Sequence, residues 1–458
     1  MTQRPRQGSH WRETPLARIL GPMQEFIQQS QSGGIVLLVM TGIALLVANS
    51  PLNTGYLALL DTPIAISAGP FVLEESVLHW VNDGLMAIFF FVVGLEIKRE
   101  VLVGELASLR AAALPIVAAI GGVTVPALIY FSFNAGGIGA RGWGVPMATD
   151  IAFVLGCLAL LGDRIPFGVK IFLTAVAIVD DLIAVLMIAI FYTSTIQPIM
   201  LGIGFSILLV LALANTFGIR NPLVYASLGV LVWLAFLHSG VHATIAGVLI
   251  ACTIPARSQI DAPTFLARAA HSLRQFDQND GNATQAQTSE LQQSAIIDLE
   301  DVCEQAQTPL RKFEHRLNKW VAFVIMPVFA LVNAGVVLSA ESFRGDSTTV
   351  LIGIVVGLTI GKPIGIVGAA WIAVRVGIAE LPQGVSWRHM LGTGILAGMG
   401  FTMSLFIASL AFTDPDTLAT AKLAILLASL LAGSIGLLVL RQIPNTEPLP
   451  VQTEHVIH

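Results

Sequence analysis

The stretch Thr174-Ala-Val-Ala-Ile-Val-Asp180-Asp181-Leu-Ile-Ala-Val185 places two adjacent carboxylates in the middle of a long apolar run. A charge at mid-depth of a spanning helix costs about 2.5–3.5 kcal/mol on insertion scales, so such residues mark functional sites. Successive helical residues point about 100° apart. One aspartate can therefore face a central site while the other reaches a neighbouring helix. The alternative is a pair of helix-end charges, which the apolar residues on both sides disfavour.

The composition around this stretch predicts a membrane protein with many spans. Of the 458 residues, 55% are hydrophobic and 12% are charged, whereas soluble proteins carry about 25% charged residues. The formal net charge is −5 and the basic residues form no single patch, so we expect no nucleic-acid partner. The three cysteines, Cys157, Cys252 and Cys303, show no metal-ligand or disulfide spacing.

The chain contains about twelve apolar runs close to the roughly 20 residues that a spanning helix needs. They lie near 33–50, 79–96, 111–132, 144–161, 167–192, 197–216, 221–238, 240–255, 318–339, 349–374, 388–412 and 417–440. Nearly all Lys and Arg residues fall in alternate connections, and only Arg141 and Arg344 fall on the opposite side. This bias predicts that both termini are cytoplasmic.

Two connections are long. The segment 51–78 has no Lys or Arg, and we expect Tyr56–Leu60 and Ile64–Ser67 to form two short strands on the external face. The segment 256–310 is rich in Gln, Asn, Asp, Ala and Ser. Its composition predicts a mobile cytoplasmic loop, with a helix near 289–306 and no chemistry of its own.

Two spans carry residues that interrupt a helix. One contains Gly142-Trp-Gly-Val-Pro146-Met-Ala-Thr149-Asp150, and the other contains four glycines between Gly392 and Gly400. A broken helix inside a membrane is tolerated where its free backbone groups line a cavity, and paired breaks indicate two repeats that meet at a midplane site. The alternatives are a proline-kinked continuous helix and a glycine face for close packing.

Lys362 follows Gly361 and precedes Pro363 in the middle of another span. A buried ammonium beside a proline break is the natural counter-charge for the aspartates, and a snorkelling lysine is the alternative. Carboxylates, the hydroxyl of Thr149 and backbone carbonyls are hard oxygen ligands that suit a small hard cation. Because the same carboxylates bind protons, a cation and protons would compete, which produces exchange if the site faces one side at a time.

These residues belong to stretches that resemble the NhaA family of bacterial sodium/proton antiporters. The similar stretches occur in family order from about residue 30 to 440. They are Asp83–Glu100, Ala148–Phe153, Ala177–Leu182, His238–Thr244, Pro327–Gly335, Gly361–Gly365 and Gly398–Phe406. Two features differ from the family pattern, namely the length of 256–310 and Asn318 in place of a histidine.

The resemblance implies roles for single residues. Asp181, Asp180 and Thr149 would bind the sodium ion, and the two aspartates would carry protons. Asp150 would balance the helix ends at the interruption, and Lys362 would pair with Asp180. A cytoplasmic cluster would respond to alkaline pH, although ordinary positive-inside flanking charge is the alternative reading. Its members are Glu96, Arg99, Glu100 and Glu314.

The resemblance also implies the architecture. We expect an all-α protein of the bacterial inner membrane with about twelve spans, inverted repeats, two interrupted helices crossing at mid-membrane and a small external β-hairpin that supports a homodimer. The expected regions run in order: a cytoplasmic segment 1–30, two spans with the hairpin 31–110, core repeat 111–193, interface spans 194–255, loop 256–310, interface span 311–345, core repeat 346–441 and cytoplasmic tail 442–458.

The implied activity is electrogenic, pH-regulated export of Na⁺ or Li⁺ in exchange for protons, serving salt tolerance and pH homeostasis. Such a transporter is not an enzyme and needs no cofactor, and its surroundings are membrane lipid. Two other classes of membrane protein are alternatives to an antiporter. A cation channel would need an open pore, which a lysine-blocked site disfavours. An intramembrane aspartyl protease would need two carboxylates sharing a proton, which Lys362 would disturb.

Overall fold

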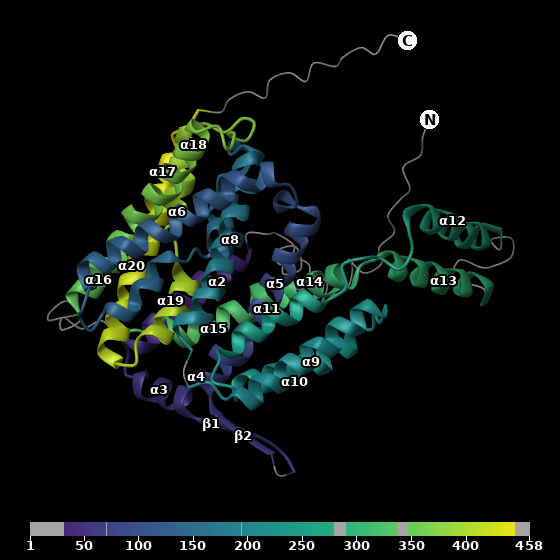
Figure 1. Cartoon of the computed structure of the whole chain (residues 1–458), viewed down its shortest axis with the longest axis horizontal. Coiled ribbons are helices and arrows are strands. Elements are labelled where there is room, and N and C mark those ends of the chain that lie inside the picture. Colours follow the sequence, from purple (N-terminus) through teal and green to yellow (C-terminus); the bar gives the residue numbers. More distant parts are fainter. Residues whose placement is uncertain (1–31, 70, 194, 279–289, 338–346, 445–458) are drawn as a thin grey trace, which may run out of the picture. The chain divides into compact units, whose positions relative to one another are not determined.

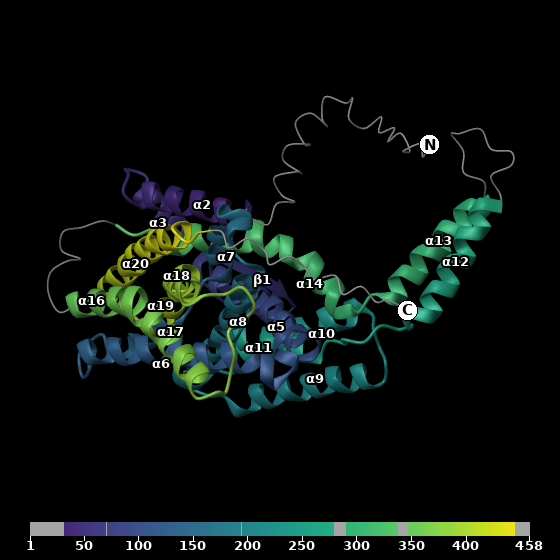
Figure 2. The ribbon, with the colours of Figure 1, turned by 90° about the horizontal axis from the view of Figure 1, so that it is seen from above.

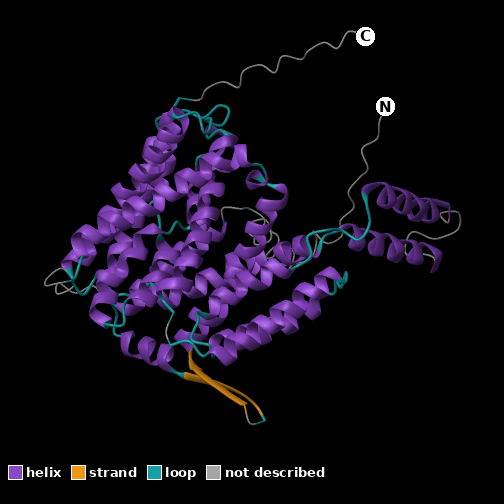
Figure 3. Cartoon of the chain, viewed as in Figure 1, coloured by secondary structure: helices purple, strands orange, loops and turns teal. Residues whose placement is uncertain are grey.

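The computed structural model describes residues 32–69, 71–193, 195–278, 290–337 and 347–444, and it is mostly helical (Figures 1 and 3). Within these residues, seven helices are long and apolar enough to cross a membrane, or up to nine if each bent pair counts as one span. The chain is therefore a multi-pass membrane protein, and the count of twelve stays a prediction. The predicted segment 1–30, residues 445–458 of the tail and Arg344 lie outside the described residues.

The chain divides into two units. The first comprises residues up to 78, 105–187 and those from 322 onward. Its elements are α2 (Ser32–Ala48), α3 (Asn53–Asp61), β1 (Pro63–Ala68), β2 (Phe71–Ser76), η3 (Glu105–Ala107), α6 (Leu109–Asn134), η4 (Ala140–Met147), α7 (Ile151–Leu160), η5 (Gly162–Arg164), α8 (Phe167–Phe191, up to 187), α15 (Met326–Asn333), α16 (Thr348–Val356), η8 (Gly357–Gly361), α17 (Lys362–Arg375), α18 (Trp387–Leu396), α19 (Phe401–Ala411) and α20 (Pro415–Arg441).

The second unit comprises residues 79–104 and 188–321. It contains η2 (Trp80–Leu85), α5 (Met86–Val103), α9 (Pro198–Thr216), α10 (Pro222–Leu237), α11 (Ala243–Thr253), α12 (Ala262–Gln278), α13 (Glu290–Ala306) and α14 (Pro309–Trp320). The short helix α4 (Val77–His79) and the π-helical turn η6 (Val321–Ile325) cross the limits between the units.

Helices α6 and α17 lie side by side in both views of the first unit (Figures 1 and 2). Glycines allow the contact: a Cβ built on Gly121 would lie 2.3 Å from the carbonyl oxygen of Gly365, and one on Gly365 would lie 2.2 Å from that of Gly121. The two backbones therefore touch directly, as small residues permit between membrane helices. This packing holds Lys362, at the start of α17, against the rest of the unit.

Both predicted interruptions are present. The 3-10 helix η4 ends at Met147 and α7 begins at Ile151, and between them Ala148 and Asp150 have extended backbone. Helix α18 ends at Leu396 and α19 begins at Phe401, with a bend of 46° between their axes. The prediction of a broken helix is confirmed at both places.

The prediction of a proline break beside Lys362 is wrong. The span Thr348–Arg375 continues through this region, and the five residues Gly357–Gly361 form the π-helical turn η8. Pro363 lies in the first turn of α17. A π-turn accommodates a proline because it re-spaces the backbone hydrogen bonds where the proline donates none.

The strands of the hairpin are shifted from their predicted positions. Strands β1 and β2 pair antiparallel from Pro63↔Ser76 to Ala68↔Phe71, and Gly69 in the turn has φ +62°, which favours glycine. The predicted strand Tyr56–Leu60 is wrong, because these residues belong to helix α3. Tyr56 and Leu60 are both buried and stand four residues apart, the spacing of one helix face.

The segment 256–310 contains more structure than expected. Helix α13 confirms the helix predicted near 289–306. However, α12 is also helical and lies beside α13 in both views (Figures 1 and 2), so a loop without further structure was the wrong expectation. Residues 279–289 lie outside the described part of the chain.

Candidate functional site

Helix α8 carries Asp180 and Asp181 in its interior. Their relative exposures are 1% and 2%, although an isolated carboxylate strongly prefers water. The helix forms because the residues around the pair are apolar and it packs within the core of the first unit. The predicted burial of both aspartates is confirmed.

Lys362 from α17 reaches Asp180. Its Nζ lies 2.6 Å from Oδ2 of Asp180, and neither side chain is exposed. The same ammonium also donates to the carbonyl oxygen of Met147, at the end of η4. The pairing that the sequence predicted is therefore present, and the snorkelling alternative for Lys362 is wrong because the side chain points into the protein.

Thr149 lies in the first interruption, within reach of two acceptors. Its Oγ1 is 2.8 Å from Oδ2 of Asp180 and 3.0 Å from the carbonyl oxygen of Ala397, at the second interruption. A hydroxyl has one hydrogen, so it donates to one of these acceptors at a time and keeps lone pairs for another ligand. Thr149, in the first interruption, thus connects Asp180 with Ala397 in the second interruption.

Asp150 joins the two interrupted helices through its carboxylate. Its Oδ1 accepts from the N–H of Phe153 at 3.0 Å and caps α7. Its Oδ2 accepts from the N–H of Thr402 at 3.1 Å and from Thr402 Oγ1 at 2.5 Å, in the first turn of α19. One negative charge thereby faces the N-termini of two helices, where helix dipoles favour it.

Thr402 is a site residue for which no role was predicted from the sequence. It stands two positions after the last of the four glycines in the second interruption. A hydroxyl placed directly after a break at a helix N-terminus is the signal that could have identified it.

One carboxylate oxygen of Asp180 is available for a further ligand. Asp180 Oδ1 is buried and has no hydrogen-bond partner in the described part of the chain. Among the described residues, no group of three or more His, Cys, Asp or Glu side chains could hold a metal ion. Carboxylate, hydroxyl and carbonyl oxygens such as those around Asp180 are hard ligands that can bind a hard monovalent cation.

The second unit brings the predicted cytoplasmic cluster together. Arg99 Nη2 lies 2.9 Å from Glu100 Oε1 and 3.6 Å from Glu96 Oε1, and Arg99 Nη1 pairs with Glu314 Oε1. Glu314 comes from α14 and the other three residues from α5. The geometry establishes an ion-pair network, and its response to pH stays a prediction.

A second polar contact in this unit joins two stretches that the sequence singled out separately. Asp83 Oδ1 lies 3.8 Å from His242 Nε2, and the backbone carbonyl of Asp83 accepts from Trp233 Nε1 at 3.0 Å. Asp83 lies in η2, which is a π-helical turn. Neither side chain was predicted to have a role from the sequence.

Many apolar spans, two helices interrupted within the protein and buried charges beside the breaks define a membrane transporter of the secondary type. The comparisons agree with this class. The model of the family "Na+/H+ antiporter 1" matches residues 24–440, and the chain belongs to this family.

Relatives named Na(+)/H(+) antiporter NhaA are similar along almost the whole chain. The protein of Oleidesulfovibrio alaskensis is 49% identical over 93% of this chain and 95% of its own length. That of Acidithiobacillus ferrooxidans is 48% identical over 93% and 98%, and that of Koribacter versatilis is 47% identical over 93% and 92%. The predicted resemblance is confirmed.

Proposed function

We propose that this protein exchanges Na⁺ or Li⁺ for protons at a site formed by Asp180, Asp181 and Thr149. The observation that carries this proposal is the buried Asp180 carboxylate, which pairs with Lys362 through Oδ2 and leaves Oδ1 without a hydrogen-bond partner among the described residues. A buried oxygen of this kind is a ligand for a proton or for a cation. The names of the relatives support sodium as that cation.

Competition at this site accounts for exchange. When a sodium ion enters, its charge takes the place of protons on the two aspartates and weakens the contact between Asp180 and Lys362. When the site faces the side of higher proton activity, the carboxylates take up protons and release sodium. Two aspartates can take up two protons for one sodium ion, so we expect the exchange to be electrogenic.

Alternating access would come from the two predicted repeats, 111–193 and 346–441, within a twelve-span fold. Each predicted repeat contains one interruption. Asp150 links the two interrupted helices to each other, and Thr149 contacts both Asp180 and Ala397 at the second interruption. A movement of the interrupted helices would therefore change the surroundings of Asp180 directly. Asp150 would hold the facing helix N-termini together without binding the transported ion.

Regulation and assembly form the outer part of the proposal. The network of Glu96, Arg99, Glu100 and Glu314 would adjust the activity at alkaline pH. The hairpin β1–β2 would support a homodimer, since an isolated two-stranded hairpin is marginal in water without a partner. The protein would lie in the bacterial inner membrane with both termini in the cytoplasm.

The test uses inside-out vesicles that maintain a respiratory pH gradient. Adding Na⁺ or Li⁺ should collapse the gradient in vesicles containing the wild-type protein, more strongly at alkaline than at mildly acidic pH. Asp181→Asn should abolish the response, because an amide neither ionises nor binds a cation strongly. Asp416→Asn, an exposed aspartate in the first turn of α20, is the matched control and should respond like the wild type.

Three outcomes contradict the proposal. They are collapse of the gradient by potassium alone, no effect of sodium with folded protein present, and retained exchange in Asp181→Asn. Sodium flux without proton movement would favour the channel alternative, and proteolysis that depends on both aspartates would favour the protease alternative.

A further inference from the structure

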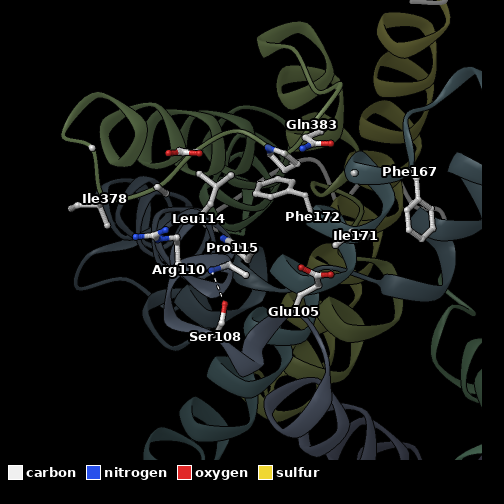
Figure 4. A pocket seen from close by; sticks show the side chains of 16 residues that line it. Glu105, Ser108, Arg110, Leu114, Pro115, Phe167, Ile171, Phe172, Ile378 and Gln383 are labelled. Carbon is white, nitrogen blue, oxygen red and sulfur yellow. Dashed lines mark hydrogen bonds between the residues drawn. The ribbon is translucent and has the colours of Figure 1, made fainter. Parts of the chain in front are cut away.

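A cavity of about 930 Å³ opens at the end of the first unit where α6 and α8 begin (Figure 4). Residues 105–115 and 167–172 form two sides of the cavity. The loop that joins α17 to α18 forms the third side, with residues 377–380, 382 and 383. None of the residues assigned to ion exchange lines it. Its volume falls within the range of about 300–1,000 Å³ that is typical of ligand sites.

The interior of this cavity is apolar. Leu114 and Phe172 are almost fully buried, with 3% and 2% exposure, and they belong to the hydrophobic core beneath the cavity. Figure 4 shows them next to Pro115, between the charged side chains. The core therefore separates the cavity from the polar interior of the unit.

The polar residues of the lining carry both signs of charge. Arg110 offers a guanidinium, whereas Glu105 and Glu380 offer carboxylates and Gln383 an amide. Figure 4 shows Arg110 and Glu105 on different sides of the cavity. A purely anionic ligand would face two carboxylates and a purely cationic one would face the guanidinium. The set matches a ligand that carries a phosphate and an ammonium together.

Large apolar side chains stand exposed in the cavity lining, at Phe167 and Ile378, and beside it in the sequence, at Leu109. Leu109 is 91% exposed, Phe167 74% and Ile378 58%. Exposed apolar side chains of a membrane protein can contact acyl chains, and charged residues are enriched at the level of the lipid headgroups. The ligand is therefore expected to carry apolar chains as well as a zwitterionic head with a phosphate and an ammonium.

We propose that this cavity binds the headgroup of a phospholipid with a primary amine, of the phosphatidylethanolamine type. Arg110 pairs with the phosphate, and Glu105 and Glu380 accept hydrogen bonds from the ammonium. A primary ammonium donates three hydrogen bonds, whereas a quaternary ammonium donates none, so the site prefers ethanolamine to choline. The acyl chains extend along Leu109, Phe167 and Ile378. This inference does not depend on the ion that the protein exchanges.

The test measures the thermal unfolding of the delipidated full-length protein in detergent while single lipids are added. Phosphatidylethanolamine should raise the Tm in a saturable way, and phosphatidylglycerol and phosphatidylcholine should raise it less, because binding to the native state stabilises it. Arg110→Gln should increase the half-saturating lipid concentration at least about tenfold, the effect of losing a charge-assisted hydrogen bond. Arg164 is an exposed arginine that does not line the cavity, so Arg164→Gln should leave the half-saturating lipid concentration unchanged.

A double variant separates the two ends of the headgroup. Glu105→Gln with Glu380→Gln should remove the preference for ethanolamine over glycerol headgroups while keeping binding through Arg110. Counting bound lipids by native mass spectrometry gives a second readout if a variant is less stable. Equal stabilisation by all three lipids, or wild-type behaviour of Arg110→Gln, overturns the proposal. Equal stabilisation by water-soluble glycerophosphoethanolamine also overturns it, because the site would then take a soluble phosphoamine.

Discussion

At the scale of single residues, the contact between Lys362 and Asp180 is the least expected on energetic grounds. Both side chains are fully buried, and desolvating two charges often costs more than their attraction returns. Asp180 also accepts from Thr149, and Lys362 donates to the carbonyl of Met147, so the pair is anchored on both sides. A pair that adds little stability but can be separated by a competing cation is consistent with a role in exchange.

We expect Lys362→Met to destabilise the protein by about 3–5 kcal/mol, because it leaves a buried carboxylate without its counter-charge. Adding Asp180→Asn to this variant should restore much of the lost stability, although neither variant should exchange ions. Thermal unfolding in detergent measures the first effect and the vesicle assay measures the second. Lys319→Met, an exposed lysine of α14, is the control. If the double variant were as unstable as Lys362→Met alone, the unpaired Asp180 carboxylate would not be the cause of the lost stability.

At the scale of elements, Asp150 and Thr402 tie the two interrupted helices together. The carboxylate and hydroxyl are buried, with 1% and 0% exposure, and their contact spans 252 positions of the sequence. Because each helix contributes its N-terminus, losing this link should affect the arrangement of both interruptions at once.

Thr402→Val removes the hydroxyl and retains the shape of the side chain. We expect a loss of about 1.5–3 kcal/mol, the contribution of a hydrogen bond to a charged group, and a changed sodium concentration for half-maximal exchange. Thr402→Ser should recover most of the wild-type behaviour. Thr393→Val is the control, since that hydroxyl donates only within its own helix, to the carbonyl of His389. Equal effects of the two valine variants would argue against a special role for Thr402.

The contact of α6 with α17 makes a second prediction at this scale. Gly365→Ala should be destabilising by about 1–3 kcal/mol or more, the typical cost of overpacking, because the new methyl group would meet the backbone of Gly121. Gly368→Ala in the same helix should be tolerated, since among the described residues nothing lies within 4 Å of its Cβ position. Unfolding temperatures of both variants in detergent test this, and equal values would refute the close backbone contact.

At the scale of the whole molecule, the predicted topology puts the hairpin outside and the α12–α13 segment inside the cell. In a variant without Cys157, Cys252 and Cys303, a cysteine replacing Glu74 in β2 should react with an impermeant maleimide in intact cells. A cysteine replacing Arg274 in α12 should react only after permeabilisation. Both positions are exposed, so access across the membrane decides the outcome. The reverse labelling pattern would invert the assignment.

Much of this protein could be predicted from local features of its sequence. Apolar runs of sufficient length predict helices, because backbone groups inside a bilayer must bond within their own segment. The two interruptions were also predictable. Pro146 and the glycines between Gly392 and Gly400 have low helix propensity and disfavour a continuous helix. The buried carboxylates of Asp180 and Asp181 stood out because charge is rare in such runs.

The tertiary structure decided those contacts between distant groups that the sequence did not predict. The contact of Thr402 with Asp150 and the cavity between α6, α8 and residues 377–383 depend on how the helices pack, which no local pattern encodes. Packing also overrode local expectations where Tyr56–Leu60 became helical and where a π-turn carried the chain past Pro363. The sequence by itself thus determined where charge and helix breaks occur, because these are properties of neighbouring residues. The partners of Asp150 and Asp83 were decided by contacts across the folded chain, because they come from helices far away in the sequence.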